Sequence, residues 1–493
     1  MGRLVDRSLV SVTVTADGPR YRLLESVAAY ARERLYEAGE FGSAMDRHAS
    51  YFREFAERAE PHLRGAGQRL WLARLDAESA NTRAALDHAL RSGDPHGVVR
   101  LAAALCPWWL LRGRLHEARR TLAAAVEAVP AHASAELRLL HGAFAMLTGG
   151  RVPDAECPEA DIADPARRGR ALWLFAYGLH HAGDPAAAQE VNARALDRFT
   201  EAADRWGTAA ARALRAHTAF AAGDLRTARH DGLDSSASFH ELGDGWGELL
   251  TVPVLAALAE IEGDYATAAS RQTEGLRLAE GLGLAAEASA RLAGLGRLAL
   301  LAGDWERARV LHEQARRAAA EQGHMFGEVF ALMGLALGAR RSGDLDAAEH
   351  HFRTMRDAYP SSTAGKHLIH VELGFVAELR GRLEEAAAYQ ARGLEFAERL
   401  ADPRALALSL EGTAAVAAAM GDGAGLTRAA VLLGAADTAR RSVGAPLPEA
   451  ESADVRRAMA AIITVLGPSE YATAFQAGAT MPLTDAVRTA AGP

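Results

Sequence analysis

Gly223-Asp224-Leu225-Arg226-Thr227-Ala228 is one copy of a short pattern that recurs along the chain at an almost constant interval. Further copies, each with an alanine five residues after its glycine, begin at Gly113, Gly183, Gly263, Gly303, Gly343 and Gly381, and a degenerate copy begins at Gly421. From Gly183 onward the spacings are 40, 40, 40, 40, 38 and 40 residues. A fixed period of this size is typical of stacked helical repeats.

Each copy predicts the turn of a helical hairpin. Glycine after an apolar run can take the left-handed conformation that ends a helix, and the following aspartate can accept the free amide hydrogens of the next helix. A small residue also stands seven positions before each glycine, as at Ala216 and Ala256. Small residues at these positions would let the two helices of a pair approach closely.

This pattern of small residue, Gly-Asp, aromatic or leucine, and alanine resembles the tetratricopeptide repeat, lengthened from about 34 residues to about 40. The resemblance covers roughly residues 95 to 440. It implies an all-α, right-handed superhelix of helical hairpins, and we assign residues 61–440 to this array. A second glycine series marks the passage from one hairpin to the next at Gly243, Gly283 and Gly323. Aromatic residues in the same phase are expected as core wedges between repeats: Trp206, Trp246 and Phe326.

The composition fits an intracellular protein. Hydrophobic residues make up 49 % of the chain, yet no run is long enough for a membrane helix and the N-terminus lacks a signal-peptide pattern. Two cysteines cannot build a disulfide framework. The net charge of −8, from 55 basic and 63 acidic residues, gives no overall attraction to nucleic acid or anionic lipid. We therefore expect a cytoplasmic protein that does not bind membranes.

The N-terminal region differs from the repeats. Residues 8–14 alternate like a β-strand and residues 20–24 predict the returning strand of a hairpin. Helices are predicted over residues 25–38 and from about 43 to 60. So small a unit cannot bury a core of its own and must pack on something larger. We interpret residues 1–60 as a partial winged-helix-like unit that caps the first repeat.

The same region carries a second resemblance. Its motifs are Leu4-Val-Asp-Arg-Ser-Leu-Val10, Tyr21-Arg-Leu-Leu-Glu25, Tyr30-Ala-Arg-Glu-Arg-Leu35, Arg47-His-Ala-Ser-Tyr-Phe52, Trp71-Leu-Ala-Arg-Leu75 and Glu78-Ser-Ala-Asn-Thr-Arg-Ala-Ala-Leu86. They resemble the region after the nucleotide-binding module in large actinobacterial transcriptional regulators of the STAND or NB-ARC type, which include AfsR-like and MalT-like proteins. Three C-terminal motifs are similar to the end of the sensor array in those regulators: Ala430-Val-Leu-Leu-Gly-Ala-Ala436, Gly444-Ala-Pro-Leu-Pro448 and Leu483-Thr-Asp-Ala486.

The resemblance implies an ATPase switch, a winged-helix relay, a repeat sensor and a DNA-binding domain at one end. This chain is similar to the sensor region, and we assign residues 441–493 to a C-terminal helical cap. No Gly-x-x-x-x-Gly-Lys-Ser/Thr loop occurs, because Gly365-Lys366 is followed by His367 and lacks the first glycine. We expect no ATP hydrolysis and no cofactor. Whether Met1 is the native start or an ATPase module lies upstream stays open.

Direct nucleic-acid binding is not expected either. No helix-turn-helix is recognised after Leu483. Residues 1–48 hold seven arginines and seven acidic residues, so they carry no basic excess for phosphates.

A ligand site is expected on the concave face of the array, because the first helix of each tetratricopeptide pair lines the groove. Counting back from each glycine places aromatic and arginine side chains there, which suits a small molecule or extended peptide with an anionic group. The predicted ligand-binding residues are Arg170, Trp173, Tyr177, His180, His217, Arg297 and Arg340. The first four form the strongest cluster, at helical spacing on one face. The alternative is that these residues are partly core and partly solvated surface.

No catalytic residue or metal site is predicted. His367 and His370 stand near Glu372 but lack the tighter zinc signatures. Cys106, at a small-residue packing position, is expected to be buried and inert, and Cys157 to be exposed. The stretch around Cys157, about residues 149–168, breaks the repeat rhythm and predicts a mobile loop or a shortened repeat.

The sequence therefore predicts a non-catalytic regulatory sensor or scaffold, similar to the effector-sensing part of a STAND regulator. It would bind a small molecule, a peptide or a regulatory protein in its groove and transmit binding through the curvature of the superhelix. Two alternatives stay open: a repeat-fold enzyme repurposed for specialised metabolism, and a pure protein-interaction adaptor. The ligand, the regulated pathway and the oligomeric state are not predicted.

Overall fold

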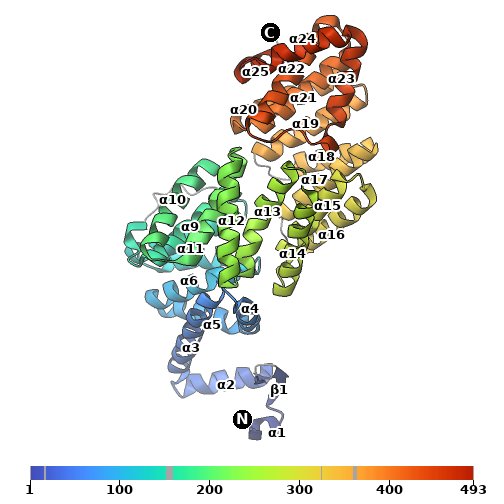
Figure 1. Cartoon of the computed structure of the whole chain (residues 1–493). Helices are drawn as coiled ribbons and strands as arrows, with labels where there is room; N and C mark the ends of the chain where they lie inside the picture. The colour runs from blue at the N-terminus through green and yellow to red at the C-terminus, as the bar shows by residue number, and fades with distance from the viewer. Residues whose placement is uncertain are drawn as a thin grey trace.

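The computed structural model describes residues 2–15, 18–150, 159–321, 323, 325–358 and 363–491. These residues form 25 α-helices, three short 3₁₀ helices and one β-hairpin, so the predicted all-α class is confirmed. Figure 1 shows helix pairs stacked into a superhelix with the two termini at opposite ends. Among the described residues, every helix is too short or too polar to cross a lipid bilayer.

Helix pairs joined by short turns build the array. The first pair is α6 (Pro95–Leu111) with α7 (Leu115–Ala128). The later pairs are α9 (Pro165–His181) with α10 (Pro185–Glu201), α11 (Arg205–Ala221) with α12 (Leu225–Leu242), α13 (Gly245–Ile261) with α14 (Tyr265–Leu282), α15 (Ala285–Leu301) with α16 (Trp305–Glu321), α17 (Met325–Ser342) with α18 (Leu345–Ala358), α19 (Thr363–Leu379) with α20 (Leu383–Leu400), and α21 (Pro403–Met420) with α22 (Gly423–Ser442).

The Gly-Asp turns have the predicted geometry. Gly183 and Gly223 adopt φ of 85° and 81°, the left-handed region that glycine enters without strain. The side chains of Asp184 and Asp224 accept hydrogen bonds from backbone N–H groups three residues on, at 3.0 and 3.1 Å. The same cap recurs at Asp264, Asp304 and Asp344. Each turn therefore ends one helix and starts the next, as the pattern predicts.

The small residues of the pattern lie where the paired helices meet. Ala216, Ala228 and Ala268 are buried, which lets the helix axes come close. Trp206 and Trp246 are buried between repeats, as expected. The side chain of Phe326 lies outside the described residues.

A single helix stands where one hairpin is expected. α8 (Ala135–Leu147) packs between α7 and α9. Much of the chain that follows it, residues 151–158 with Cys157, lies outside the described residues. The described part of this unit is one α-helix with a short 3₁₀ helix on either side, η1 (Ala131–Ala133) and η2 (Glu159–Asp161), which agrees with the predicted break in the repeat rhythm.

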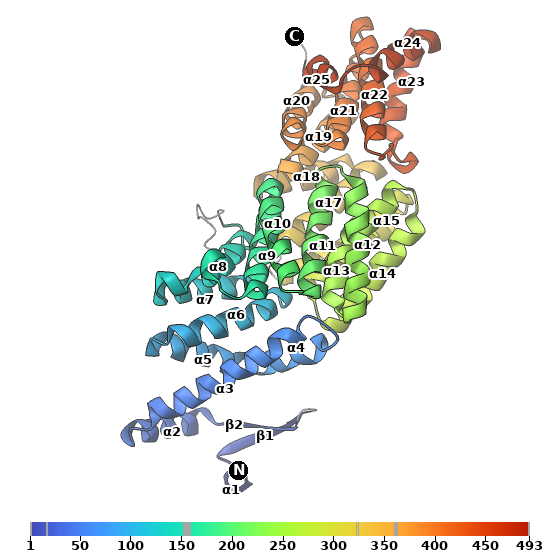
Figure 2. The same ribbon diagram turned by 60° about the vertical axis from the view of Figure 1, so that its left-hand side comes forward.

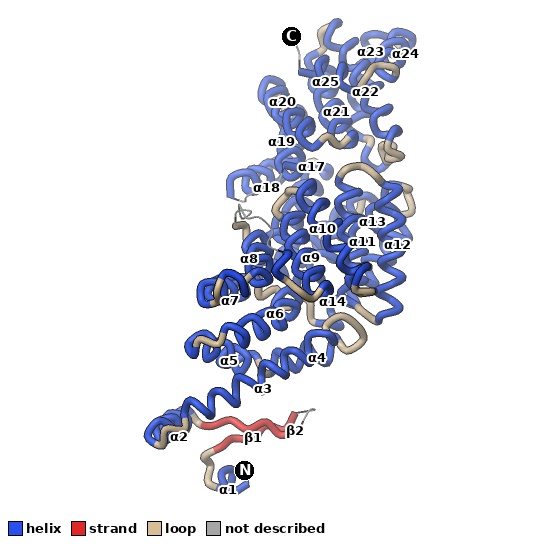
Figure 3. Tube along the Cα trace, turned by 90° about the vertical axis from the view of Figure 1, so that its left-hand side faces the viewer, coloured by secondary structure: helices blue, strands red, loops and turns tan. Residues whose placement is uncertain are grey.

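The N-terminus forms the predicted hairpin, with strands β1 (Val10–Thr15) and β2 (Gly18–Leu23) antiparallel. Helix α1 (Gly2–Asp6) precedes the hairpin, and α2 (Glu25–Glu37) follows it and has no buried residue. Figures 2 and 3 show that the hairpin and α2 extend away from the repeats. The hairpin is tied to the array where Arg20 donates to Glu78 Oε1 at 2.8 Å.

The first repeat is covered by α3 (Phe41–His62) and α5 (Ser79–Ser92), which both pack on α6, rather than by the hairpin. α4 (Gln68–Ala77) lies between them in the chain. The boundary expected at residue 60 falls inside α3. The reason is the apolar face of α3, whose Phe55 and Ala59 belong to the core of the array.

The segment that joins α3 to α4 lies against repeats far along the chain. Gln68 donates to Asp244 Oδ1 at 2.5 Å and accepts from the backbone N–H of Trp246 at 3.1 Å. Arg112, at the end of α6, donates to the carbonyl of Leu282 at 2.7 Å. The first superhelical turn, from α3 to α14, therefore closes on itself.

The C-terminal elements pack on the last helix pair. They are η3 (Glu449–Glu451), α23 (Ala453–Leu466), α24 (Pro468–Ala479) and α25 (Leu483–Ala491). α22 and α24 touch at glycines, since a Cβ on Gly478 would lie 1.8 Å from the carbonyl oxygen of Val431. That space admits no side chain at all.

The glycine contact can be tested by substitution. We expect Gly478→Ala to lower the free energy of unfolding by more than about 1 kcal/mol, because the backbone of α22 would have to move. Gly281→Ala is the matched control, since its Cβ would meet nothing within 4 Å and alanine favours the helix. Thermal unfolding followed by circular dichroism measures both. An equal loss in the two variants would contradict the close crossing.

Candidate ligand-binding site on the inner face

Two neighbouring cavities lie on the inner face of the first superhelical turn. One, the charged cavity, has a volume of about 290 Å³ and is lined by Glu57, Glu60, Arg64, Arg100, Glu136, Arg167 and Arg170. The other, the aromatic cavity, has a volume of about 250 Å³ and is lined by Tyr177, His180, His217, Glu287 and Arg291. Leu110, Trp173 and Trp246 line both and form their common wall.

Trp173 links three successive repeats within this wall. Its ring centroid lies 5.4 Å from that of Trp206 on α11 and 6.0 Å from that of Trp246 on α13, edge-on in both cases. Nε1 of Trp206 donates to Asp244 at 2.5 Å, whereas Nε1 of Trp173 is buried without a hydrogen-bond partner. A buried donor without an acceptor is costly, so this indole can gain a hydrogen bond from a ligand.

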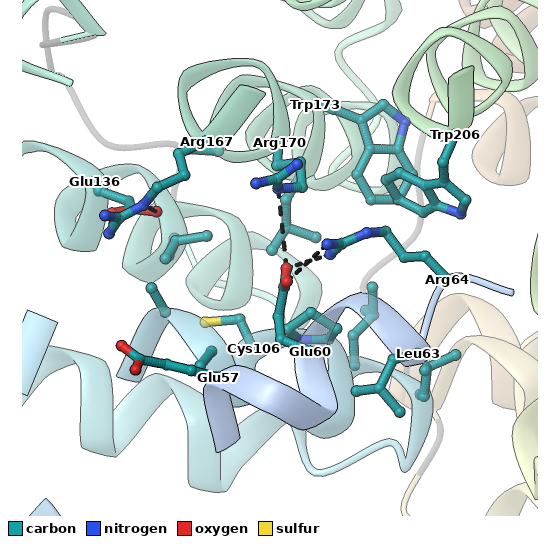
Figure 4. Close-up of a pocket in the computed structure, with 18 of the residues that line it drawn as sticks. Glu57, Glu60, Leu63, Arg64, Cys106, Glu136, Arg167, Arg170, Trp173 and Trp206 are labelled. Atoms are coloured by element: carbon teal, nitrogen blue, oxygen red, sulfur yellow. Dashed lines mark hydrogen bonds and ion pairs between the residues drawn. The ribbon is translucent and has the colours of Figure 1, made fainter. Parts of the chain in front are cut away.

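The charged side chains of the charged cavity are paired with one another or with neighbours. Figure 4 shows the guanidinium groups of Arg64 and Arg170 directed at the carboxylate of Glu60. Arg170 also donates to Asp204 at 3.0 Å. The remaining pairs are Arg100 with Glu57 and Arg167 with Glu136.

Burial and pairing set the protonation of this cavity. Burial opposes ionisation of Glu60, but Arg64 and Arg170 outweigh it and hold the pKa of Glu60 below its ordinary value. Burial raises the pKa of Cys106, whose thiol is fully enclosed as expected. Cys106 is therefore a packing residue with no tendency to form a thiolate.

The structure brings Tyr177, His180 and His217 together in the aromatic cavity. Tyr177 stacks on Trp173 with ring centroids 5.6 Å apart, and the rings of His180 and His217 are 5.7 Å apart. Burial lowers the pKa of His180 to about 3 and lowers that of His217. Both imidazoles are therefore neutral at neutral pH. Nε2 of His217 donates to the carbonyl of Leu250 at 2.7 Å, which leaves Nδ1 as an acceptor.

Arg291 of the same cavity was not among the residues selected from the sequence. Arg170 stands 13 residues before the glycine of its repeat, whereas Arg291 stands 12 residues before Gly303 and so falls outside the predicted groove positions. A signal was nevertheless present, because Glu287 and Arg291 are the only charged residues in the stretch 285–296, which is otherwise apolar except for Ser289. Two charged residues within a largely buried helix indicate a binding site.

Arg297 and Arg340 lie in a separate groove of about 480 Å³ between later repeats. Arg297 donates to Glu451 at 3.4 Å, and Arg340 donates to Asp454 at 2.8 Å and to Glu372 at 2.6 Å. Glu451 is the last residue of η3, and Asp454 lies in the first turn of α23. Arg297 also donates to Glu260 at 2.7 Å, so each arginine binds one carboxylate from a neighbouring repeat and one from the C-terminal residues. Of the seven predicted ligand-binding residues, Trp173 and four others line these two cavities, and Arg297 and Arg340 lie in the separate groove.

Among the described residues, no group of three or more histidine, cysteine or acidic side chains is arranged to hold a metal ion. Nε2 of His367 forms a buried hydrogen bond with Ser409 Oγ at 3.0 Å. It packs inside the array rather than facing His370, whose Nδ1 bonds the carbonyl of Lys366.

No known family profile matches the chain. In sequence it is similar to proteins named HTH-type transcriptional regulators from Mycobacterium bovis and Mycobacterium tuberculosis. Each is 30 % identical over 220 residues, which are 41 % of this chain and 24 % of the regulator. The match thus spans about a quarter of the length of these curated relatives.

In structure the chain is similar to a STAND protein with a tetratricopeptide-repeat sensor from Pyrococcus horikoshii. That likeness has a TM-score of 0.39 and 14 % identity over 77 % of this chain and 55 % of that one. Yeast Tom70 gives a TM-score of 0.36 and 12 % identity over 88 % and 96 % of the two chains. The helix pairs and Gly-Asp turns themselves define the class: a tetratricopeptide-like helical-repeat protein. Part of it is similar to transcriptional regulators.

The contact between the C-terminal segment and its groove can be tested at Glu451. We expect Glu451→Gln to lower the free energy of unfolding by about 1–3 kcal/mol at neutral pH, because Arg297 and Arg341 lose their shared carboxylate. Glu449→Gln is the control, since the Glu449 side chain is 94 % exposed, and should have no effect.

The effect should also depend on pH. Burial opposes ionisation of Glu451, but the charges of Arg297 and Arg341 hold its pKa at about 2, below the ordinary 4.5. The stabilisation is therefore fully present above the unfolded pKa and is lost as the pH falls toward the folded one. The difference in melting temperature between wild type and Glu451→Gln should narrow from about pH 5 to about pH 3. A difference that stays constant over this range would contradict the assignment.

Proposed function

We propose that the chain is a non-catalytic sensor in a regulatory system and that it binds a small molecule in the cavities around Trp173. One observation carries the proposal: the aromatic cavity is lined by apolar rings and also holds buried polar atoms without partners, among them Trp173 Nε1 and His180 Nδ1. Small-molecule sites combine an apolar lining with a few such polar groups.

A small molecule suits this site better than a peptide or a protein domain. The first superhelical turn is closed by Gln68 and Arg112, which bond to α13 and to the end of α14. A peptide needs an open groove along several repeats. The groove that holds Arg297 and Arg340 is already lined by Glu451 and Asp454 from the C-terminal elements.

Binding at Trp173 can change the curvature of the superhelix. The rings of Trp173, Trp206 and Trp246 come from three successive hairpins, and Trp173 meets each of the other two edge-on. A ligand that displaces one ring changes the tilt between hairpins, because packed helices slide or rotate as rigid bodies. Through Gln68, the same movement reaches the N-terminal helices.

The chemistry of the cavities favours a sensor over an enzyme. Glu60 is ion-paired with Arg64 and Arg170, and the Cys106 thiol is fully buried. These groups bind and pack but are not poised for proton transfer or nucleophilic attack. The partial similarity to transcriptional regulators supports a regulatory role, which we place in the cytoplasm. The balanced charges of residues 1–48 make direct DNA contact by this part unfavourable.

The proposal is tested by screening a metabolite library for compounds that raise the melting temperature. We expect wild type to respond and Trp173→Ala to lose the response, since the common wall of both cavities is removed. Trp173→Phe, a smaller change, should weaken it and guards against misfolding of the first variant. Trp305→Ala is the control, because Trp305 is exposed outside these cavities.

A response that survives both Trp173 variants would remove this site. Mass spectrometry of each bound compound should return it unchanged after incubation. A converted compound would instead support the alternative of an enzyme.

A further inference from the structure

Two arginines among the described residues are fully buried, and their surroundings differ. Arg340 is 6 % exposed and pairs with Glu372 and Asp454. Arg291 is 4 % exposed, yet its Nε and Nη1 atoms have no hydrogen-bond partner, and it forms no ion pair within 4.0 Å among the described residues. A buried charge without partners is strongly unfavourable, so folding alone does not explain Arg291.

Arg291 faces the aromatic cavity. Its charge acts on Tyr177 and on His217, which line that cavity from α9 and α11. Its aliphatic stem lies against Gly275 of α14, where a Cβ would come within 2.9 Å of Arg291 Cδ. A glycine in a helix interior costs stability. Here it provides the room that the arginine side chain occupies.

The described neighbours of Arg291 form no ion pair with it. Glu287, one turn earlier on α15, is the only acidic residue that lines the cavity; it attracts Arg291 electrostatically but does not come within the 4.0 Å of an ion pair. Burial raises the pKa of Glu287, while His180 and His217 are neutral. The fully buried guanidinium therefore remains without a hydrogen-bonded anion.

Apart from its histidines and Glu287, the cavity has mainly apolar walls, several of them flat rings. Trp173 and Tyr177 stack at an interplanar angle of 29°. Leu249, Leu250 and Pro253 line the cavity from α13. Such walls favour a planar or aliphatic body, and Nδ1 of His180 and Nε1 of Trp173 can each add one hydrogen bond.

Resting on the sensor function proposed above, we propose that the ligand is a small organic carboxylate whose apolar body lies in the aromatic cavity and whose carboxylate pairs with Arg291. The planar guanidinium fork matches a carboxylate in geometry. One arginine beside Glu287 suits a single negative charge rather than a dianionic phosphate. The charged cavity offers no such position, because its arginines already hold carboxylates.

The proposal is tested by calorimetric titration of the full chain with benzoate, phenylacetate and indole-3-acetate, each against its neutral primary amide. We expect the best carboxylate to bind at least about 30-fold more tightly than its amide. Arg291→Met should abolish this preference. Glu287→Gln should strengthen carboxylate binding, because it removes the nearby acidic group. Arg212→Met is the control and should change nothing, since Arg212 on α11 is partly exposed, pairs with Asp234 and does not line the cavity.

Equal binding of carboxylate and amide by wild type would overturn the proposal, as would a preference that survives in Arg291→Met or the absence of binding by all three carboxylates. Failure of the carboxylate proposal can be told apart from failure of the sensor function. Neutral compounds that bind through Trp173 but ignore Arg291 would leave the sensor in place and remove only the carboxylate. If no compound binds in a Trp173-dependent way, both the sensor function and the carboxylate ligand are ruled out.

A ligand-free measurement gives an independent check. Because Arg291 lacks partners, Arg291→Met should keep or raise the melting temperature of the empty protein. Arg340→Met should lower it, because Glu372 and Asp454 lose their partner. A drop in Arg291→Met as large as that in Arg340→Met would show that Arg291 serves the fold, which contradicts a ligand role.

Discussion

Close packing of two helices at the turn of every hairpin is the constraint on which the rest of the structure depends. Buried alanines such as Ala228 and Ala268 let the helices meet, and Gly-Asp turns end and restart them at a fixed interval. The first helix of each repeat therefore reaches the inner face in the same way. α9, α11, α13 and α15 converge there, and the aromatic cavity is a product of the repeat itself.

Much of the fold could be predicted from sequence because its signals are local. The period, the caps at Asp184 and Asp224 and the N-terminal hairpin each depend on a few neighbouring residues. The C-terminal partners of Arg297 and Arg340 could not be predicted, since Glu451 and Asp454 are more than 100 residues away. Arg291 was missed for a smaller reason: a shift of one residue in helix phase moves a side chain by about 100° around the helix.

The groove of Arg297 and Arg340 differs from the aromatic cavity of Arg291 in whether the chain itself supplies carboxylate partners for the arginines. Arg297 and Arg340 find carboxylates within the chain, so that groove contributes to the attachment of the C-terminal cap. Arg170 is likewise satisfied by Glu60 and Asp204. Arg291 alone among the buried arginines of the described residues lacks such a partner. Sites of function are often places where folding leaves a group unsatisfied.

The central claim is that the inner face of the first turn holds a small molecule. The most direct measurement is native mass spectrometry of the full chain purified from its own host, with the Arg291→Met variant prepared in parallel. We predict that the wild type retains a small adduct that the variant has lost, and that the released compound is a carboxylic acid. No adduct on the wild type, or the same adduct on both proteins, would contradict the account.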